Sequence, residues 1–227
     1  MEDIKYNVIF SRRRSISIIV RPDKSVTVRA PFRTPLNTIN KFVLSKSSWI
    51  KKHLNNEPGI RLANTNRKYT SGEDFLYLGK EYKLTIIQSE ENFIRLREDE
   101  IQAGLKDVND TDKVKCLISE WFYNKAREVI TNEFLRITDK YSHYVFRPSA
   151  LAIRPLKSRW GSCSPKGKIT INSELIKLNP VILDYVIIHE LCHLKYHNHG
   201  PDFHKLLGEL VPDYKILRKE LRKYLIK

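Results

Sequence analysis

The sequence contains few of the residues that break or constrain a chain: its 227 residues include 8 glycines, 10 prolines and 3 cysteines. This composition excludes a collagen-like repeat, and 41% hydrophobic residues can build a core, which excludes intrinsic disorder. The three cysteines, Cys116, Cys163 and Cys192, are odd in number and form no C-x-x-C pair. Because a disulfide framework needs paired cysteines, the sequence favours reduced thiols in a cytoplasmic protein.

Long apolar segments and several common active-site motifs are also missing. The most apolar stretch, residues 181–194, is shorter than the roughly 20 residues of a bilayer span and is interrupted by Asp184, His189 and Glu190. The N-terminal residues show no signal-peptide pattern, so we expect a soluble protein with no membrane partner. The absence of G-x-S-x-G, G-x-G-x-x-G and a phosphate-binding loop gives no support to serine-hydrolase, dinucleotide or P-loop chemistry.

Positive charge is in excess and is concentrated in the N-terminal third of the chain. There are 41 Lys and Arg against 26 Asp and Glu, a net charge of +15, and residues 1–70 hold 15 basic but only 4 acidic side chains. An uneven basic field attracts polyanions, so this region favours a nucleic acid, a nucleotide or an acidic protein as partner. Arg12, Arg13 and Arg14 form a local cluster. Solubility alone is the alternative explanation of the charge.

Hydrophobic periodicity predicts a basic, β-rich region with one helix over residues 1–105. The first three strands are expected to form a meander with a turn at 22–24. Thr34-Pro35 predicts the start of a helix that extends to about Leu54, and residues 55–66 are expected to be a loop. The predicted strands cover residues 6–10, 15–21, 25–29, 75–78, 82–87 and 93–96.

Residues 106–227 switch to helical periodicity and form the second predicted domain. A broad apolar stripe predicts a helix over 111–140. Asn179-Pro180 predicts the start of another helix, which is expected to run to about Tyr196. The remaining predicted elements are strands at 151–153 and 168–172, a loop at 157–167, and a helical stretch over 202–225 that breaks at Pro212.

Five of the seven histidines lie between residues 189 and 204. Within this segment, His189-Glu190-Leu191-Cys192-His193 is an H-E-x-x-H motif on a predicted helix. Residues four apart on an α-helix project from the same face, so His189 and His193 can chelate one Zn²⁺. Glu190 can then act on a water as general base without binding the metal itself. The motif predicts a hydrolase with one zinc ion per chain, and another divalent transition metal is the alternative.

A catalytic zinc takes three protein ligands and keeps one open position. His199 is the best candidate for the third ligand, because it lies just after the predicted helix and can fold back toward the metal. His204 is the alternative ligand, and Glu209 is a weaker one. If the helix continues, His197 lies about 12 Å farther along its axis than His189, which is too far to share the ion.

Arg159 and Trp160 are candidate substrate-binding residues. Arg159 can hold a carboxylate or a phosphate, and Trp160 can form a pocket wall; the alternative is that the pair only locks its loop by stacking and hydrogen bonds. Arg154 is a weaker candidate of the same kind. Cys192 points away from the face of the two histidines, so we expect it in the core.

Motifs along nearly the whole chain resemble the YgjP-like metallopeptidase family of zincin-like hydrolases. The most specific are R-W-G-S-C at residues 159–163 and H-E-L-C-H at residues 189–193, taken together. The sequence departs from the family at Gly200, where Ser is frequent, and at His204, where an aromatic residue is usual. The second departure favours His204 as an auxiliary ligand. The other matching segments are Arg12-Arg13-Arg14, Ala30-Pro31, Trp49-Ile50, Gly72-Glu73, Tyr77-Leu78-Gly79, Ile171-Asn172, Asp184-Tyr185-Val186, Asn198-His199 and Phe203.

The resemblance implies both a fold and two kinds of substrate. In the implied zincin-like fold, the H-E-x-x-H helix packs under a small mixed sheet whose edge strand can pair with an extended substrate. A remote similarity to the SprT and WLM proteases, which cut proteins crosslinked to DNA, implies a substrate near nucleic acid that residues 1–70 would hold. A bacterial member of the family is described as hydrolysing UTP to UMP and pyrophosphate, which implies a nucleotide pyrophosphatase as the alternative.

We therefore predict an α+β protein with a β-rich basic N-terminal region and a zincin-like catalytic region. The predicted function is a cytoplasmic zinc metallopeptidase with His189, His193 and His199 as ligands and Glu190 as general base. Besides the nucleotide pyrophosphatase, a nucleic-acid-binding module with a structural metal is a third alternative. Glu190 argues against that module, because a purely structural metal site needs no base.

Overall fold

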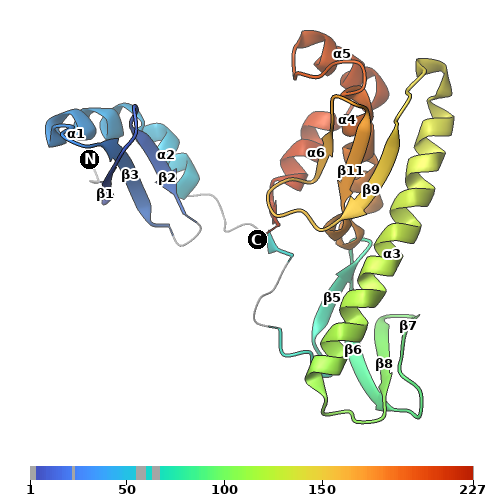
Figure 1. The fold of residues 1–227 in the computed structure, drawn as a ribbon. Coiled ribbons are helices and arrows are strands. Elements are labelled where there is room, and N and C mark those ends of the chain that lie inside the picture. Colours follow the sequence, from blue (N-terminus) through green and yellow to red (C-terminus); the bar gives the residue numbers. More distant parts are fainter. Residues whose placement is uncertain (1–3, 22–23, 55–59, 63–66, 227) are drawn as a thin grey trace. The chain divides into compact units, whose positions relative to one another are not determined.

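The computed structural model describes residues 4–21, 24–54, 60–62 and 67–226. The chain divides into two compact units, Met1–Ile60 and Arg61–Lys227 (Figure 1). This division differs from the boundary at residue 105 that the sequence analysis placed, because the strands that precede residue 105 share a core with the long helix that follows them. The turn predicted at Pro22 and Asp23 and most of the loop predicted over 55–66 lie outside the described residues.

The first unit contains a three-stranded sheet whose central strand is the last of the three in sequence. β3 (Val26–Pro31) is parallel to β1 (Asn7–Ser11) and antiparallel to β2 (Ser17–Val20). The predicted meander is therefore wrong, since a meander would place β2 in the centre. The order follows the burial, because Val26 and Val28 of β3 are buried whereas every residue of β1 and β2 is at least partly exposed.

Two short helices, α1 (Leu36–Ser45) and α2 (Ser47–Leu54), replace the single helix predicted for this region. The chain leaves helical geometry at Lys46, where φ is −109° and ψ is 10°. Thr34 does not cap α1, because its hydroxyl donates a hydrogen bond to the carbonyl of Pro31 at 2.8 Å. The buried residues of the first unit are Val26, Thr27, Val28, Ala30, Ile39, Val43 and Ile50.

The second unit begins with a four-stranded sheet in the order β5-β6-β8-β7. β5 (Asp74–Tyr77) and β6 (Lys80–Gln88) form a hairpin, and its turn residues Leu78 and Gly79 have φ values of 50° and 80°. β7 (Phe93–Arg97) confirms the predicted strand, whereas β8 (Glu100–Leu105) was not predicted. Its sequence, EIQAGL, contains one β-branched residue and no aromatic residue, so its strand pattern is weak.

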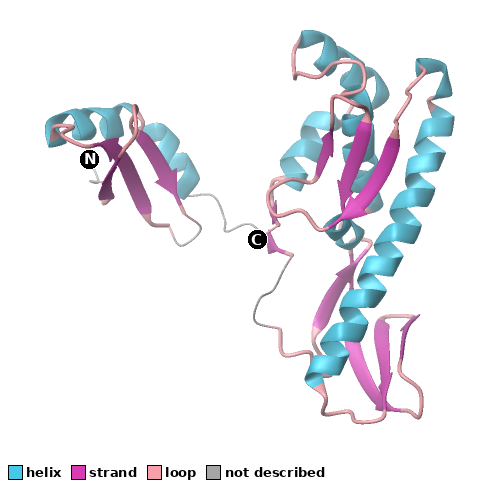
Figure 2. Cartoon of the chain, viewed as in Figure 1, coloured by secondary structure: helices cyan, strands magenta, loops and turns pink. Residues whose placement is uncertain are grey.

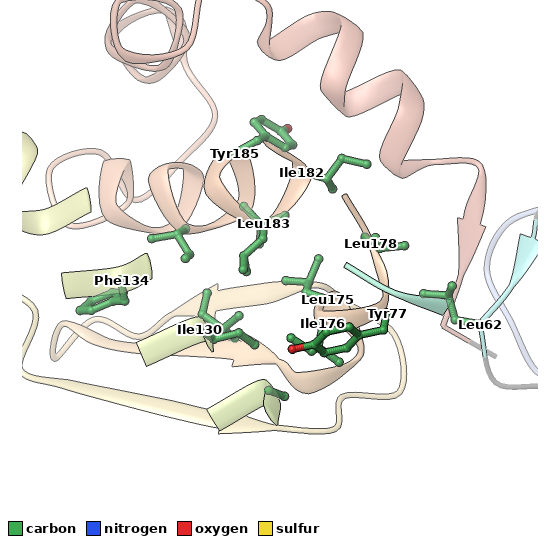
Figure 3. Close-up of a cluster of buried hydrophobic side chains, with 14 of the residues drawn as sticks. Leu62, Tyr77, Ile130, Phe134, Leu175, Ile176, Leu178, Ile182, Leu183 and Tyr185 are labelled. Atoms are coloured by element: carbon green, nitrogen blue, oxygen red, sulfur yellow. The ribbon is translucent and has the colours of Figure 1, made fainter. Parts of the chain in front are cut away.

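The 30-residue helix α3 (Thr111–Lys140) matches its prediction and runs beside both sheets of this unit (Figure 2). Asp110 caps its start by accepting a hydrogen bond from the backbone N–H of Lys113 at 2.9 Å. Figure 3 shows Ile130 and Phe134 of α3 in one cluster with Leu183. One continuous core therefore joins the four-stranded sheet to the elements that carry the histidines.

The second sheet of this unit has the order β10-β11-β9. β11 (Lys168–Asn172) is central, β9 (Ala150–Arg154) is parallel to it, and β10 (Gly161–Cys163) is the antiparallel edge strand. β10 lies inside the predicted loop at 157–167. The sequence did not reveal this strand because its three residues are too few to show a period of two.

Helices cover one face of the β9–β11 sheet and complete the mixed α+β fold, as predicted. Two short strands, β4 (Ile60–Arg61) at the unit boundary and β12 (Tyr224–Leu225), pair with each other. Within the described ranges, no helix is long and apolar enough to span a membrane. The helices after α3 are η1 (Ser142–Tyr144), η2 (Ser173–Lys177), α4 (Pro180–Cys192), α5 (Pro201–Leu210) and α6 (Tyr214–Leu221).

Candidate metal centre

Helix α4 carries the H-E-x-x-H motif into the core of the second unit. It begins where the sequence predicts, with the Asn179 side chain accepting a hydrogen bond from the N–H of Val181 at 3.0 Å. It ends at Cys192 rather than near Tyr196, and the N–H of Leu194 bonds back to the carbonyl of Leu191 at 3.0 Å. Nine of its thirteen residues are buried. His189 lies in its last turn, and His193 is the residue that directly follows its end.

Three imidazoles meet at this end of α4. His189, His193 and His199 each offer a nitrogen, and these three atoms lie within 4.8 Å of one another. The Nε2 atoms of His189 and His199 are 3.1 Å apart. The fully buried ring of Phe203, from α5, lies against all three imidazoles, with ring centroids 4.6 to 5.0 Å away. The structure thus brings together the three histidines that the sequence singled out.

The hydrogen bonds and burial of these histidines suit a metal. His193 Nδ1 lies 2.9 Å from the carbonyl oxygen of Tyr196, so this nitrogen donates and Nε2 keeps its lone pair. Burial lowers the pKa of His189 to about 3, with the neighbouring histidines adding to the effect, and burial also lowers the pKa of His199. Neutral imidazole is the form that binds a metal. A tetrahedral ion with bonds of about 2.0 to 2.1 Å separates its nitrogens by roughly 3.3 Å, which fits this spacing.

Glu190 lies beside the three histidines but is not one of the converging groups. Its side chain is 5% exposed, and burial raises its pKa to about 8 against the opposing charge of Arg159. Gly161 of the edge strand β10 packs directly on it, since a Cβ at this position would lie 2.5 Å from Glu190 Oε1. The close approach of backbone and carboxylate explains why the R-W-G-S-C segment has glycine here.

The candidate substrate-binding residues divide between two faces of the site. Exposed Arg159 lines a cavity of about 610 Å³ together with the three histidines, and half-buried Trp160 lines a second cavity of about 550 Å³ beside His189 and Glu190. Arg154 does not line either cavity. It lies on the outer face of the β9–β11 sheet, in a hollow of about 580 Å³ that it shares with Arg159.

The two alternative ligands lie outside the group of three histidines. The Nδ1 atom of His204 is buried without a hydrogen-bond partner among the described residues. The ring of His204 stacks on Tyr214, with centroids 5.8 Å apart, and lies 6.4 Å from the ring of His199, outside the group of three. Glu209 accepts a hydrogen bond from the hydroxyl of Tyr144 at 2.5 Å.

Two further side chains bear on the predicted site. His197 was excluded as a ligand on the premise that the helix continues to it, and this premise is wrong because α4 ends at Cys192. The exposed His197 nevertheless lies outside the group of three histidines. Cys192 is in the core as predicted, and burial raises the pKa of its thiol to about 12.

Sequence analysis missed three basic residues of the cavity of about 550 Å³: Lys157, Arg218 and Arg222. Lys157 precedes β10, whereas Arg218 belongs to α6 and Arg222 directly follows its end. The only signal was the spacing of the two arginines, which are four residues apart and so share one helix face. Nothing in the sequence indicates that this face meets the H-E-x-x-H helix.

The chain is similar to one protein family along most of its length and to two solved structures over a part of it. The family model for the YgjP-like metallopeptidase domain matches residues 14–224. The metallopeptidase zymogen jannalysin of Methanocaldococcus jannaschii is 23% identical with a TM-score of 0.37, over 41% of this chain and 94% of its own. The zymogen abylysin of Pyrococcus abyssi is 24% identical with a TM-score of 0.36, over 41% of this chain and 93% of its own. No curated protein matches the chain.

Proposed function

Because the chain belongs to the YgjP-like family of metallopeptidase domains, we propose that it is a zinc-dependent peptidase of the cytoplasm. The observation that carries this proposal is the convergence of three imidazole nitrogens within 4.8 Å beside a buried glutamate. His189, His193 and His199 are the proposed ligands, and Glu190 is the proposed general base. A set of three imidazole nitrogens favours zinc among the divalent metals. The order of metal affinities alone does not decide which metal occupies such a site.

The metal, when bound, polarises the scissile carbonyl and acidifies a water molecule. Glu190 is placed to take a proton at Oε1 or Oε2 and to return it to the leaving amine. In the metal-free protein, burial raises the pKa of this carboxyl to about 8, and the Arg159 charge opposes that rise. Gly161 leaves the space that this carboxylate occupies, because a Cβ at this position would lie 2.5 Å from its Oε1.

The edge strand β10 supports an extended peptide as the substrate. β11 covers one edge of β10, and no other strand among the described residues pairs with it. An exposed strand edge can bind a peptide by main-chain hydrogen bonds, which places the peptide along Arg159–Cys163 and next to Glu190. In this arrangement Arg159 and Trp160 contact the substrate on either side of the strand.

The test compares the wild-type protein with Glu190→Gln, both loaded with zinc, on a denatured protein substrate. The substitution keeps the shape of the side chain and removes the base, so we expect one zinc per chain in both proteins and a loss of cleavage of at least 100-fold in the variant. Mass spectrometry of the products and metal analysis by plasma mass spectrometry give the two readouts. Equal cleavage by both proteins would refute the role of Glu190.

The same two proteins also test the alternatives. Release of pyrophosphate from UTP by the wild type, absent in Glu190→Gln, would favour the nucleotide pyrophosphatase. Binding of DNA that persists after removal of zinc, without turnover of peptide or UTP, would favour the nucleic-acid-binding module.

A further inference from the structure

The cavity of about 550 Å³ is lined by His189, Glu190 and two further kinds of residue. One kind is aromatic or apolar and includes Trp160, Tyr185 and Leu221. The other kind is basic. Its members are Lys157, Arg218 and Arg222, and Glu190 itself is the only acidic residue in the lining. The cavity therefore adjoins the candidate reaction site and has a local excess of positive charge.

The three basic side chains have no partner among the described residues. No ion pair or side-chain hydrogen bond joins Lys157, Arg218 or Arg222 to any other described group. The acidic groups nearest in sequence are engaged elsewhere, because Asp184 pairs with Arg136 and Glu220 pairs with Lys223. The positive charge of this cavity is therefore not paired with any acidic side chain of the described residues.

The two arginines are exposed and line the cavity one helical turn apart. Arg218 belongs to α6, which packs on α4, and Arg222 directly follows the end of that helix. Like charges at this spacing repel each other. A bound anion between them would remove that repulsion.

We propose that this cavity binds a carboxylate of the peptide substrate next to the scissile bond, with Arg218 and Arg222 as the residues that determine specificity. This inference rests on the proposed peptidase function. A guanidinium presents two parallel N–H donors that match the two oxygens of a carboxylate. The apolar side chains of Leu221 and Trp160 suit the methylene groups of a glutamate side chain. A lining that combines apolar and charged groups fixes a ligand's orientation.

The carboxylate can come from an acidic side chain or from the C-terminus of the peptide, and matched substrates distinguish the two sources. The first pair differs only by Glu or Gln beside the cleaved bond, with both C-termini amidated. The second pair carries Gln at that position and has a free or an amidated C-terminus. The enzymes are wild type, Arg218→Gln, Arg222→Gln and the double variant. Lys219→Gln is the control. This substitution also removes one positive charge from α6, but Lys219 does not line the cavity.

We expect the wild type to cleave the carboxylate member of one pair at least 10-fold more efficiently than its neutral partner. Each arginine substitution should lower kcat/KM for that member by about 10-fold and leave the neutral member within twofold, since one charge-assisted hydrogen bond contributes roughly one order of magnitude. The double variant should lose the preference entirely, and Lys219→Gln should retain it. Arg218→Glu should reverse it, so that a peptide with Lys at the same position becomes the better substrate.

Three results overturn the inference. The first is equal cleavage of both members of both pairs by the wild type, and the second is a preference that survives in the double variant. The third is a preference for UTP over every peptide that depends on the same arginines. Failure of the proposed function looks different, because no peptide would then be cleaved by any enzyme of the set, and Glu190→Gln would match the wild type.

Discussion

Replacing Glu190 by Gln should change the pH dependence of stability of the metal-free protein. The carboxyl is 5% exposed and lies against the backbone of Gly161, so ionisation within the fold is costly. Burial raises its pKa from the ordinary value of 4.5 to about 8. A raised pKa in the folded state means that the protonated carboxyl stabilises the fold. This contribution is fully present below pH 4.5 and is lost as the pH rises toward 8.

The size of the effect follows from the two pKa values. Between pH 5 and pH 8 the unfolded chain releases the Glu190 proton while most of the folded protein retains it, so unfolding becomes easier. Linkage gives a loss of roughly 3 to 4 kcal/mol of unfolding free energy over this interval, and the protein with Gln at this position does not show this loss. For a unit of about this size, the same difference corresponds to roughly 7 to 14 °C in melting temperature.

Urea titration at pH 5, 6, 7 and 8, in the presence of a chelator, measures the effect. Because every other group titrates in both proteins, the quantity of interest is the difference between wild type and Glu190→Gln at each pH. Glu81→Gln, an exposed glutamate of β6, is the control and should show no such trend. Parallel pH profiles for wild type and Glu190→Gln, within 1 kcal/mol, would refute the reasoning, because they would mean that the folded protein solvates this carboxylate as well as water does.

Three further predictions concern the site and the basic region. Gly161→Ala should cost about 1 to 3 kcal/mol of stability and abolish cleavage while zinc is retained, since the new Cβ displaces the Glu190 carboxylate; denaturant titration, activity and metal analysis check this. His199→Ala should lower zinc content well below one per chain, whereas His204→Ala should keep it, as metal analysis after dialysis will show. Substituting Arg12 and Arg14 by Gln should weaken DNA binding and reduce the slope of log affinity against log salt by roughly 2, measured by fluorescence anisotropy; an unchanged slope contradicts a role for these exposed residues.

The parts of the fold that the sequence predicts well depend on local signals. The bounds of α3 follow from a long apolar stripe and a capping Asp110, and the start of α4 follows from Asn179-Pro180. The convergence of His189, His193 and His199 follows from the helical spacing of the first two and the closeness in sequence of the third. These residues lie within eleven positions of one another, so the argument needs little tertiary information.

The remaining features depend on contacts between distant segments. The order of β1, β2 and β3 is decided by which strand is buried, and alternation alone does not reveal that. β10 is defined by its pairing with β11, because its own three residues carry no period. Arg218 and Arg222 line the same cavity as Glu190 because α6 packs on α4, and a basic pair at this spacing is normally a solvated surface.

Because α4 ends at Cys192, a short segment of eight residues, 193–200, joins it to α5 and carries two of the three converging imidazoles. His189 belongs to α4, His193 directly follows the helix, and exposed His199 lies two residues before α5. An ion that joins all three would act as a crosslink that closes a small loop and anchors the start of α5 to the end of α4. Such a crosslink protects the enclosed chain from local opening. Resistance of residues 193–200 to a probing protease therefore reports on occupancy of the site without any substrate being turned over.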